Sequence, residues 1–171
     1  MDHLRAYIRD IKDFPVEGIL YRDITPLLGS PQAFNQVLDN LEERIRSSLC
    51  EAIVGIESRG FIFAVPLASR LGLPFVPIRK PGKLPYVTLA VSYELEYGSG
   101  ELEIHTDGIS EGQKVFLVDD ILATGGTLAA AASLIKTSGG DLTGAGVVIE
   151  LTELDGRRVA GIDDLYAVMK Y

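Results

Sequence analysis

The sequence lacks the features that mark disulfide-rich and membrane proteins. It holds one cysteine, Cys50, which cannot form an internal disulfide, and this fits a reducing compartment. Its most apolar stretch, 61–69, contains Pro66 and stops at Arg70, so it is too short to span a bilayer. The N-terminal segment, 1–10, mixes charges and has no apolar signal core. We therefore expect a cytoplasmic enzyme or binding domain with no membrane partner.

Positive charge is also scarce. Sixteen Lys and Arg against 24 Asp and Glu leave a net charge of −8, which is a poor overall field for DNA. We expect no nucleic-acid partner, and any anionic ligand must be met by a local site. The two histidines, His3 and His105, have no metal-ligand spacing. A chain of 171 residues, 47% hydrophobic and 23% charged, suits one globular domain over 1–171.

Hydrophobic periodicity predicts that strands and helices alternate. The expected strands are 52–56, 75–78, 115–118, 147–149 and 165–169, and the expected helices are 31–48, 60–71 and 126–138. Short connections between them predict an α/β fold, a three-layer sandwich around a mostly parallel sheet. Residues 1–30 do not join this alternation, and we expect them to cap one end of the sheet. Residues 80–100, rich in Lys, Pro and Gly, are expected to form a mobile hairpin.

The most informative stretch follows the expected strand at 115–118. Two carboxylates, Asp119 and Asp120, stand where we expect that strand to end, and 123–127 then opens a helix. Glycines let the backbone approach a ligand, and the free N–H groups and dipole of a helix start attract phosphate. The acids would repel that phosphate unless hydroxyls occupied them, because an ionised carboxylate only accepts hydrogen bonds. A ribose 5-phosphate satisfies both halves of the segment.

Other nucleotide-binding patterns are missing from the sequence. No Gly-Lys-Ser/Thr of a Walker loop occurs, and no GxGxxG follows a strand. Taken singly, the acid pair could cap a turn and the glycine pair could be a turn. The whole run, 115–127, is more specific, and it resembles the phosphoribosyl-pyrophosphate (PRPP) signature of the type I phosphoribosyltransferases. This resemblance implies that Asp119 and Asp120 hold the ribose hydroxyls. It also implies that the 5-phosphate lies on Ala123, Thr124, Gly125, Gly126 and Thr127.

Three further segments resemble the adenine phosphoribosyltransferases of that family. Residues 14–28 resemble their base-binding hood, 55–61 their pyrophosphate loop and 78–98 their flexible catalytic loop. The resemblance assigns adenine recognition to Leu20, Tyr21 and Arg22, where phenylalanine is common at position 21. It assigns pyrophosphate binding to Glu57, Ser58, Arg59, Gly60, Arg79, Lys80 and Lys83. Glu96 is the implied catalytic acid or base, and the peptide between residues 57 and 58 is implied to be cis.

The implied activity is Mg²⁺-dependent transfer of the 5-phosphoribosyl group from PRPP to N9 of adenine, which yields AMP and pyrophosphate. The Mg²⁺ is expected to be held mainly by substrate and water, with no direct protein ligand. The family also implies a homodimer, in which some of the basic loop residues cross the interface. Two alternatives stay open: the same chemistry on another purine base, and a non-catalytic regulator that senses PRPP. Without the resemblance, Glu96, the basic loop and an Arg22–Asp23 pair would fit ordinary solvated surface.

Overall fold

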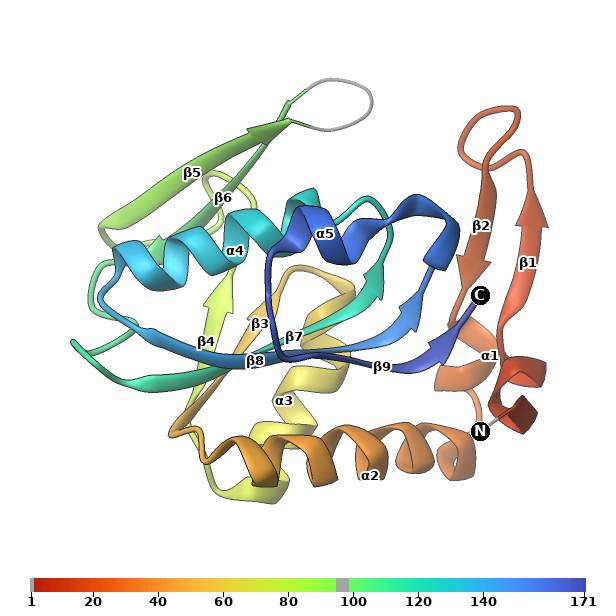
Figure 1. The fold of residues 1–171 in the computed structure, drawn as a ribbon, viewed down its shortest axis with the longest axis horizontal. Coiled ribbons are helices and arrows are strands. Elements are labelled where there is room, and N and C mark those ends of the chain that lie inside the picture. Colours follow the sequence, from red (N-terminus) through yellow and green to blue (C-terminus); the bar gives the residue numbers. More distant parts are fainter. Residues whose placement is uncertain (1, 95–98) are drawn as a thin grey trace.

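A five-stranded parallel sheet forms the centre of the molecule (Figure 1). The computed structural model describes residues 2–94 and 99–171. The sheet has the order β4-β3-β7-β8-β9, and every neighbouring pair is parallel. Its strands are β3 (Ala52–Ile56), β4 (Phe75–Ile78), β7 (Lys114–Leu122), β8 (Asp141–Glu150) and β9 (Leu165–Lys170). Their carboxyl ends meet at one edge of the sheet, which is where ligands of such folds bind.

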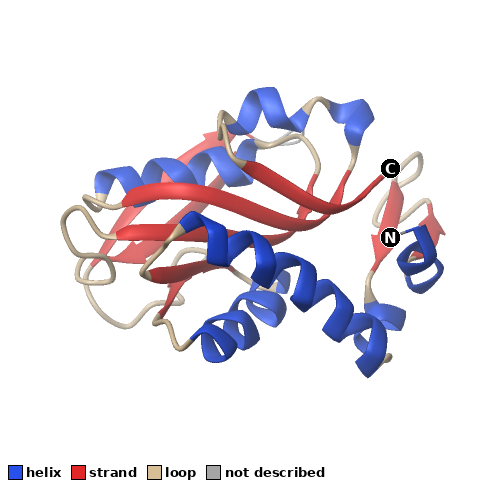
Figure 2. Ribbon diagram, turned by 60° about the horizontal axis from the view of Figure 1, so that its bottom comes forward, coloured by secondary structure: helices blue, strands red, loops and turns tan. Residues whose placement is uncertain are grey.

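Helices cover both faces of the sheet, so the molecule has three layers (Figure 2). One face carries α2 (Pro31–Ser48) and α3 (Arg59–Leu71), and the other carries α4 (Gly126–Thr137) and the short α5 (Gly156–Ala160). A hairpin of β5 (Thr88–Glu94) and β6 (Ser99–His105) packs beside α4, and a short 3₁₀ helix (Thr152–Leu154) leads from β8 to α5. The expected α/β sandwich around a parallel sheet is confirmed.

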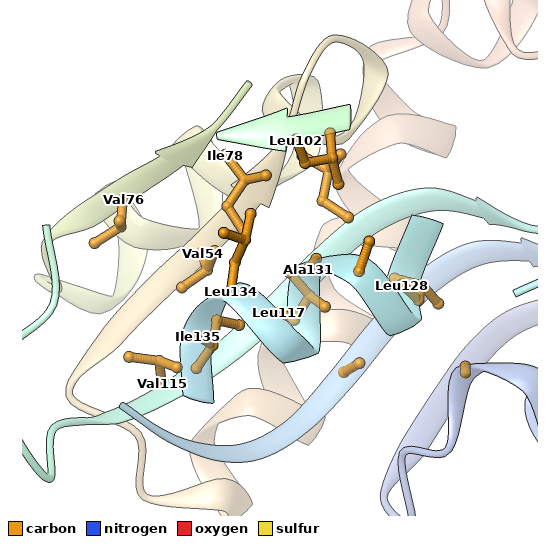
Figure 3. Packing of buried hydrophobic residues seen from close by; sticks show 14 of the residues in the cluster. Val54, Val76, Ile78, Leu102, Val115, Leu117, Leu128, Ala131, Leu134 and Ile135 are labelled. Carbon is orange, nitrogen blue, oxygen red and sulfur yellow. The ribbon is translucent and has the colours of Figure 1, made fainter. Parts of the chain in front are cut away.

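Each face of the sheet has its own hydrophobic core. On the α4 side, Val54 and Leu117 from the strands meet Leu134 from the helix, and all three are fully buried (Figure 3). On the opposite side, Leu41 of α2 and Phe63 of α3 are also fully buried. The apolar spacing that predicted the helix at 31–48 therefore marks the face of α2 that packs on the sheet.

One expectation about the central strand is wrong. β7 runs on to Leu122, so Asp119 and Asp120 lie within the strand and not in a loop after it. The reason is that hydrogen-bonded pairing with β8 continues past the acid pair, as far as Leu122 opposite Glu150. The neighbouring strand β8 supplies hydrogen-bond partners that the polarity of the β7 sequence does not reveal. The acid pair is consequently held by a rigid element.

The next strand, β8, begins earlier than its apolar run suggested. It starts at Asp141, whereas the sequence predicted 147–149. Gly144 and Gly146 interrupt the apolar pattern, but both lie against the Phe116 ring. An added Cβ would lie 2.9 Å from that ring at Gly144 and 3.1 Å from it at Gly146. These glycines therefore mark close packing inside the strand.

The N-terminal residues form a small hood at the carboxyl end of the sheet. The hood consists of a 3₁₀ helix (Asp2–Tyr7), β1 (Arg9–Lys12), β2 (Leu20–Asp23) and α1 (Thr25–Leu28). β1 and β2 pair antiparallel, and both views place this hairpin beside the end of β9 (Figures 1 and 2). Across the described ranges, no helix is both long and apolar enough to cross a membrane.

Candidate active site

A pocket of about 380 Å³ lies at the carboxyl end of the sheet, where the hood meets β3 and β7. Segments that are far apart in the sequence contribute to it: the hood, the turn after β3 and the end of β7, together with Lys80, Thr127 and Leu151. Its lining includes most of the predicted site residues, namely Leu20, Tyr21, Arg22, Glu57, Ser58, Arg59, Lys80, Asp119, Asp120 and Thr127. Gly60, Arg79 and Lys83 were predicted for the same site, but they do not line the pocket.

The two acids are nearly buried, with 8% of Asp119 and 4% of Asp120 exposed. Burial, and then the neighbouring charge of Asp120, raises the pKa of Asp119 well above its usual value. Burial also raises the pKa of Asp120, although the Arg59 guanidinium opposes the rise. Asp119 Oδ1 accepts a hydrogen bond from the Asp120 N–H at 2.9 Å. A ligand that donates further hydrogen bonds, such as a vicinal diol, would stabilise the ionised form of both acids.

Gly60 lies directly behind the acid pair. A Cβ at this position would lie 2.8 Å from Asp119 Oδ1 and 3.0 Å from the Val118 carbonyl oxygen. Any side chain here would displace Asp119, because the carbonyl belongs to a central strand that cannot move aside. The absence of a side chain thus lets the start of α3 pack against the acid pair.

Arg59 links the acid pair to the hood. Its guanidinium forms an ion pair with Asp120 and donates a hydrogen bond to the Tyr21 hydroxyl. The same group lies 5.2 Å from the centroid of the Tyr21 ring, and the Phe14 ring packs against Tyr21 in a T-shaped contact with 5.1 Å between the ring centroids. The hydroxyl that distinguishes Tyr21 from phenylalanine therefore has a partner in the site. The Arg59 side chain stays 25% exposed, so an anionic ligand can reach it.

Glu57 organises the basic loop after β4. Its carboxylate accepts hydrogen bonds from Arg79 Nε at 3.1 Å and Nη2 at 2.9 Å, and from the Lys80 N–H at 3.2 Å. These bonds, the Arg79 side chain first, lower the pKa of Glu57. Arg79 Nη1 also donates to the Lys83 carbonyl oxygen at 2.8 Å. The expected cis peptide joins Glu57 to Ser58. Glu57 thus holds the Arg79 side chain and the Lys80 backbone in place by accepting their hydrogen bonds. A phosphate oxygen could accept hydrogen bonds from the same kinds of donor.

The predicted phosphate loop borders a second, smaller pocket of about 110 Å³. The two pockets share Asp119, Ile121 and Thr127, and the smaller one is also lined by Ala123, Thr124 and Gly125. Gly125 is the N-cap of α4 and has φ +88°, a conformation that favours glycine. The first N–H groups of α4 therefore lie beside the acid pair. This arrangement suits a phosphate joined to a sugar.

The hairpin reaches this loop through Tyr93, whose hydroxyl lies 3.5 Å from Thr127 Oγ1. Glu96, the predicted acid or base, lies outside the described residues. The structure therefore brings together the predicted base, ribose and phosphate segments, and Tyr93 of β5 reaches the last of them.

Comparison with known proteins agrees with this geometry. The family model described as "Phosphoribosyl transferase domain" matches residues 27–164. An adenine phosphoribosyltransferase of Maridesulfovibrio salexigens is 52% identical over 94% of this chain and 95% of its own length. The crystal structure of the same enzyme from Thermoanaerobacter pseudethanolicus has a TM-score of 0.96, 46% identity and coverage of 99% of both chains. The chain belongs to the adenine phosphoribosyltransferase family.

A third relative of this family is similar over nearly its whole length. The Saccharomyces cerevisiae adenine phosphoribosyltransferase shares 39% identity with a TM-score of 0.91, and the match covers 98% of this chain and 97% of that one. Membership makes the chain a glycosyltransferase-type enzyme with the type I phosphoribosyltransferase fold.

Residue-level reasoning missed several side chains in the pocket of this phosphoribosyltransferase. Ile19, Ile121 and Leu151 line it and add apolar surface beside the acids. Leu151 directly follows β8, so the rule that ligands bind at the carboxyl ends of parallel strands would have found it. Ile121 was missed because the expected strand ended three residues before it. These side chains provide apolar contact for a flat ring.

Proposed function

We propose that this phosphoribosyltransferase transfers the 5-phosphoribosyl group of PRPP to N9 of adenine and releases AMP and pyrophosphate. The observation that carries the proposal is a pair of adjoining pockets that share Asp119, Ile121 and Thr127 and together connect the hood, the acid pair and the start of α4. The S. cerevisiae relative was crystallised with adenine and D-2,5-dideoxy-2,5-imino-altritol 1,6-bisphosphate. A Giardia lamblia relative, 34% identical, was crystallised with 9-deazaadenine.

The donor sugar lies between the acid pair and α4. The 2- and 3-hydroxyls of the ribose donate hydrogen bonds to Asp119 and Asp120. Burial raises the pKa of both acids, and these donated hydrogen bonds stabilise their ionised forms. The 5-phosphate lies on Ala123, Thr124, Gly125, Gly126 and Thr127. There the backbone N–H groups and the helix dipole stabilise its charge without a lysine.

Adenine lies under the hood. The backbone of Leu20, Tyr21 and Arg22 reads the donor and acceptor edge of the base, while apolar side chains contact its faces. Ile121 and Leu151 supply part of that apolar surface. Holding N9 close to C1 of the ribose lowers the activation free energy by several kcal/mol, because the two reactants are already bound next to each other.

Pyrophosphate leaves toward the basic groups. Ser58 and Gly60 offer backbone N–H groups at the start of α3, and Arg59 offers paired donors once the anion displaces its ion pair with Asp120. Glu57 holds Arg79 and the Lys80 backbone in place, and Lys83 adds charge to the same loop. As the C1–O bond breaks, its electron pair leaves with pyrophosphate, and these cations stabilise the growing negative charge.

The residues fit a Mg²⁺ ion that enters with PRPP. Among residues 2–94 and 99–171, no three His, Cys, Asp or Glu side chains form a cluster that could hold a metal ion. Mg²⁺ commonly binds through substrate phosphates and water with few protein ligands, so we expect the ion to enter together with PRPP. When bound, the ion neutralises pyrophosphate oxygens. The protein's part is to position the ribose hydroxyls on Asp119 and Asp120.

Glu96 manages the purine proton. Bond formation at N9 leaves an extra proton on the base, and a carboxylate near N7 accepts or shares it. A positioned acid or base of this kind contributes a factor of about 10²–10⁴. Closure of the 80–100 segment over the reacting centre would exclude water, which otherwise hydrolyses PRPP.

The test is to incubate the protein with PRPP and Mg²⁺ and with adenine, hypoxanthine or guanine separately, and to follow each nucleotide by chromatography. We expect AMP from adenine and far less product from the other bases. Folded protein that forms no nucleotide would overturn the enzyme proposal and leave a PRPP-sensing role. Faster turnover of hypoxanthine or guanine would overturn the choice of base.

We also propose that the enzyme is a cytoplasmic homodimer. The single cysteine supports a reducing compartment. Exposed apolar side chains near the basic loop support self-association: Val65 of α3 is 46% exposed, and Tyr86 and Val87 are 60% and 61% exposed. Light scattering coupled to gel filtration should give twice the chain mass of 18.5 kDa.

A further inference from the structure

We propose that Tyr171 is a positioning residue that ties together the two walls of the base pocket and thereby determines the affinity for adenine. The inference rests on the proposed function. Tyr171 follows β9, and both views place this end of the chain beside the β1–β2 hairpin of the hood (Figures 1 and 2).

The first wall is the hood strand β2. The Arg22 guanidinium lies over the Tyr171 ring, 4.2 Å from its centroid, and forms an ion pair with Asp10 at 2.5 Å. Only 12% of the Arg22 side chain is exposed, so this cation is removed from most of the water that would weaken the ring contact. The Arg22 backbone belongs to the segment that reads adenine. By holding the Arg22 side chain, the Tyr171 ring therefore also positions the backbone of β2 that recognises adenine.

The second wall is the turn after β8. The Tyr171 carbonyl oxygen accepts hydrogen bonds from the Thr152 N–H at 2.8 Å and from Thr152 Oγ1 at 2.6 Å. Tyr171 N–H in turn donates to the Glu150 carbonyl oxygen at 2.8 Å. Leu151 lies between Glu150 and Thr152 in the sequence and lines the pocket. One residue thus contacts the hood through its ring and the Leu151 turn through its backbone.

The ring carries the proposed role, and the hydroxyl does not. The Tyr171 hydroxyl is buried and makes no hydrogen bond to any described residue. The ring instead has a second cation, Arg5, 4.9 Å from its centroid. Arg5 also donates to the Lys170 carbonyl oxygen, so the 3₁₀ helix of the hood is joined to the end of β9. Phenylalanine at position 171 should therefore preserve the contacts with the hood, whereas an aliphatic side chain should lose them.

The test compares Tyr171→Leu and Tyr171→Phe with Tyr166→Leu. Tyr166 is a matched control, because it lies on β9, is partly buried and lines a groove with α2 away from the hood. For Tyr171→Leu we expect the KM for adenine to rise about 3- to 30-fold, the range that corresponds to a partly desolvated cation–π contact. The KM for PRPP and kcat should stay within about twofold. The other two variants should behave like the wild type.

A second measurement separates positioning from general loosening. Arg22→Met keeps the ring and removes the cation, so it should raise the adenine KM even if Tyr171→Leu fails to fold. In the Arg22→Met background, Tyr171→Leu should add less than it does in the wild type, because the contact with Arg22 is already lost and only the longer contact with Arg5 remains. Equal increases in both KM values, additive effects, or the same change in Tyr166→Leu would overturn the proposal. A wild type that forms no AMP overturns the proposed function, whereas an active wild type with an unmoved adenine KM in Tyr171→Leu overturns this inference alone.

Discussion

Gly125 and Gly156 meet backbone to backbone. A Cβ on Gly125 would clash with the Gly156 carbonyl oxygen, and a Cβ on Gly156 would clash with the Ala123 carbonyl oxygen, both well inside van der Waals contact. The phosphate loop therefore rests directly on the first residue of α5. The Arg157 guanidinium fixes α5 by donating to Glu150 Oε1 at 2.5 Å and Oε2 at 2.7 Å. The shape of the loop consequently depends on a helix that lies outside the signature sequence.

Gly156→Ala should impair PRPP binding. The added methyl group pushes Ala123 away from α5, so we expect at least a tenfold rise in the KM for PRPP and a loss of about 1–3 kcal/mol in the free energy of unfolding. Steady-state kinetics and urea unfolding measure the two effects. Gly29→Ala is the control, because a Cβ there would meet its neighbours at 3.5 Å and 3.6 Å, which is ordinary contact. An unchanged KM in Gly156→Ala would refute this role of α5.

Asp119→Asn should change how stability depends on pH. The folded-state pKa of Asp119 lies well above 3.8, its value in the unfolded chain. The folded protein therefore holds a proton that the unfolded chain releases, and stability falls as the pH rises through that interval. Asn removes this loss, so the melting temperature of the ligand-free variant should fall less than that of the wild type between about pH 4 and neutral pH.

The same variant should bind PRPP more weakly, because an amide accepts hydrogen bonds from the ribose less strongly than a carboxylate. Loss of one charge-assisted bond corresponds to about a 10- to 100-fold rise in the KM for PRPP. Asp107→Asn, which changes an exposed carboxylate, is the control for both measurements. If Asp119→Asn kept the pH profile and the KM of the wild type, the buried acid would have neither role.

Asp23→Asn should loosen the hood. The Asp23 carboxylate accepts hydrogen bonds from Thr25, backbone and side chain, and from Arg9, and these bonds lower its pKa to about 2. A lowered pKa contributes stability above the unfolded value of 3.8, and this stability is lost as the pH falls toward 2. We expect the variant to lose about 1–2 kcal/mol at pH 7, measured by urea unfolding, and no further loss at acidic pH from this group.

Because Asp23 ends β2, the strand proposed to recognise the base, the adenine KM should rise in the same variant while the KM for PRPP changes little. Asp39→Asn removes a carboxylate that is paired with Arg70 at the surface, and it should leave both quantities nearly unchanged. If Asp23→Asn and Asp39→Asn changed the stability and the adenine KM equally, the hydrogen bonds of Asp23 would have no particular role in ordering the hood.

Glu96→Ala should lower kcat by about 10²–10⁴ and leave the KM for PRPP near the wild-type value, since a proton-transfer group acts mainly in the transition state. Glu101→Ala is the matched control, because Glu101 lies on β6 of the same hairpin and its carboxylate meets the Ser92 hydroxyl at 3.3 Å. Stopped-flow or coupled assays of AMP formation measure both. Equal turnover of wild type and Glu96→Ala would assign the proton to another group.

Several parts of the fold could be predicted from the sequence because their signals are local. The helix at 31–48 and the strands at 52–56 and 75–78 have the predicted bounds, since apolar spacing, Ser30 and Pro31 lie within one stretch of chain. The prediction of the ribose and phosphate site rests on a local signal as well, because Asp119 to Thr127 form one continuous run whose chemistry suits a ribose phosphate.

Other features depended on partners distant in sequence. The strand β7 was predicted too short because Asp119 and Asp120 interrupt its apolar run, while pairing with β8 continues past them. The strand β8 was predicted too short because glycines interrupt its pattern, and the Phe116 ring packs against them. The local sequence does not show that β8 pairs with the end of β7 or that Phe116 packs on the glycines of β8.

The sequence by itself determined the layered α/β architecture and the ribose phosphate signature, because both are written in local periodicity and in one contiguous motif. Only the tertiary structure decided that Tyr171 touches the hood and that Gly156 supports the loop at the start of α4. The physical reason is that a parallel sheet gathers the ends of strands that are far apart along the chain. Contacts made there depend on how the strands pair, and no local pattern encodes them.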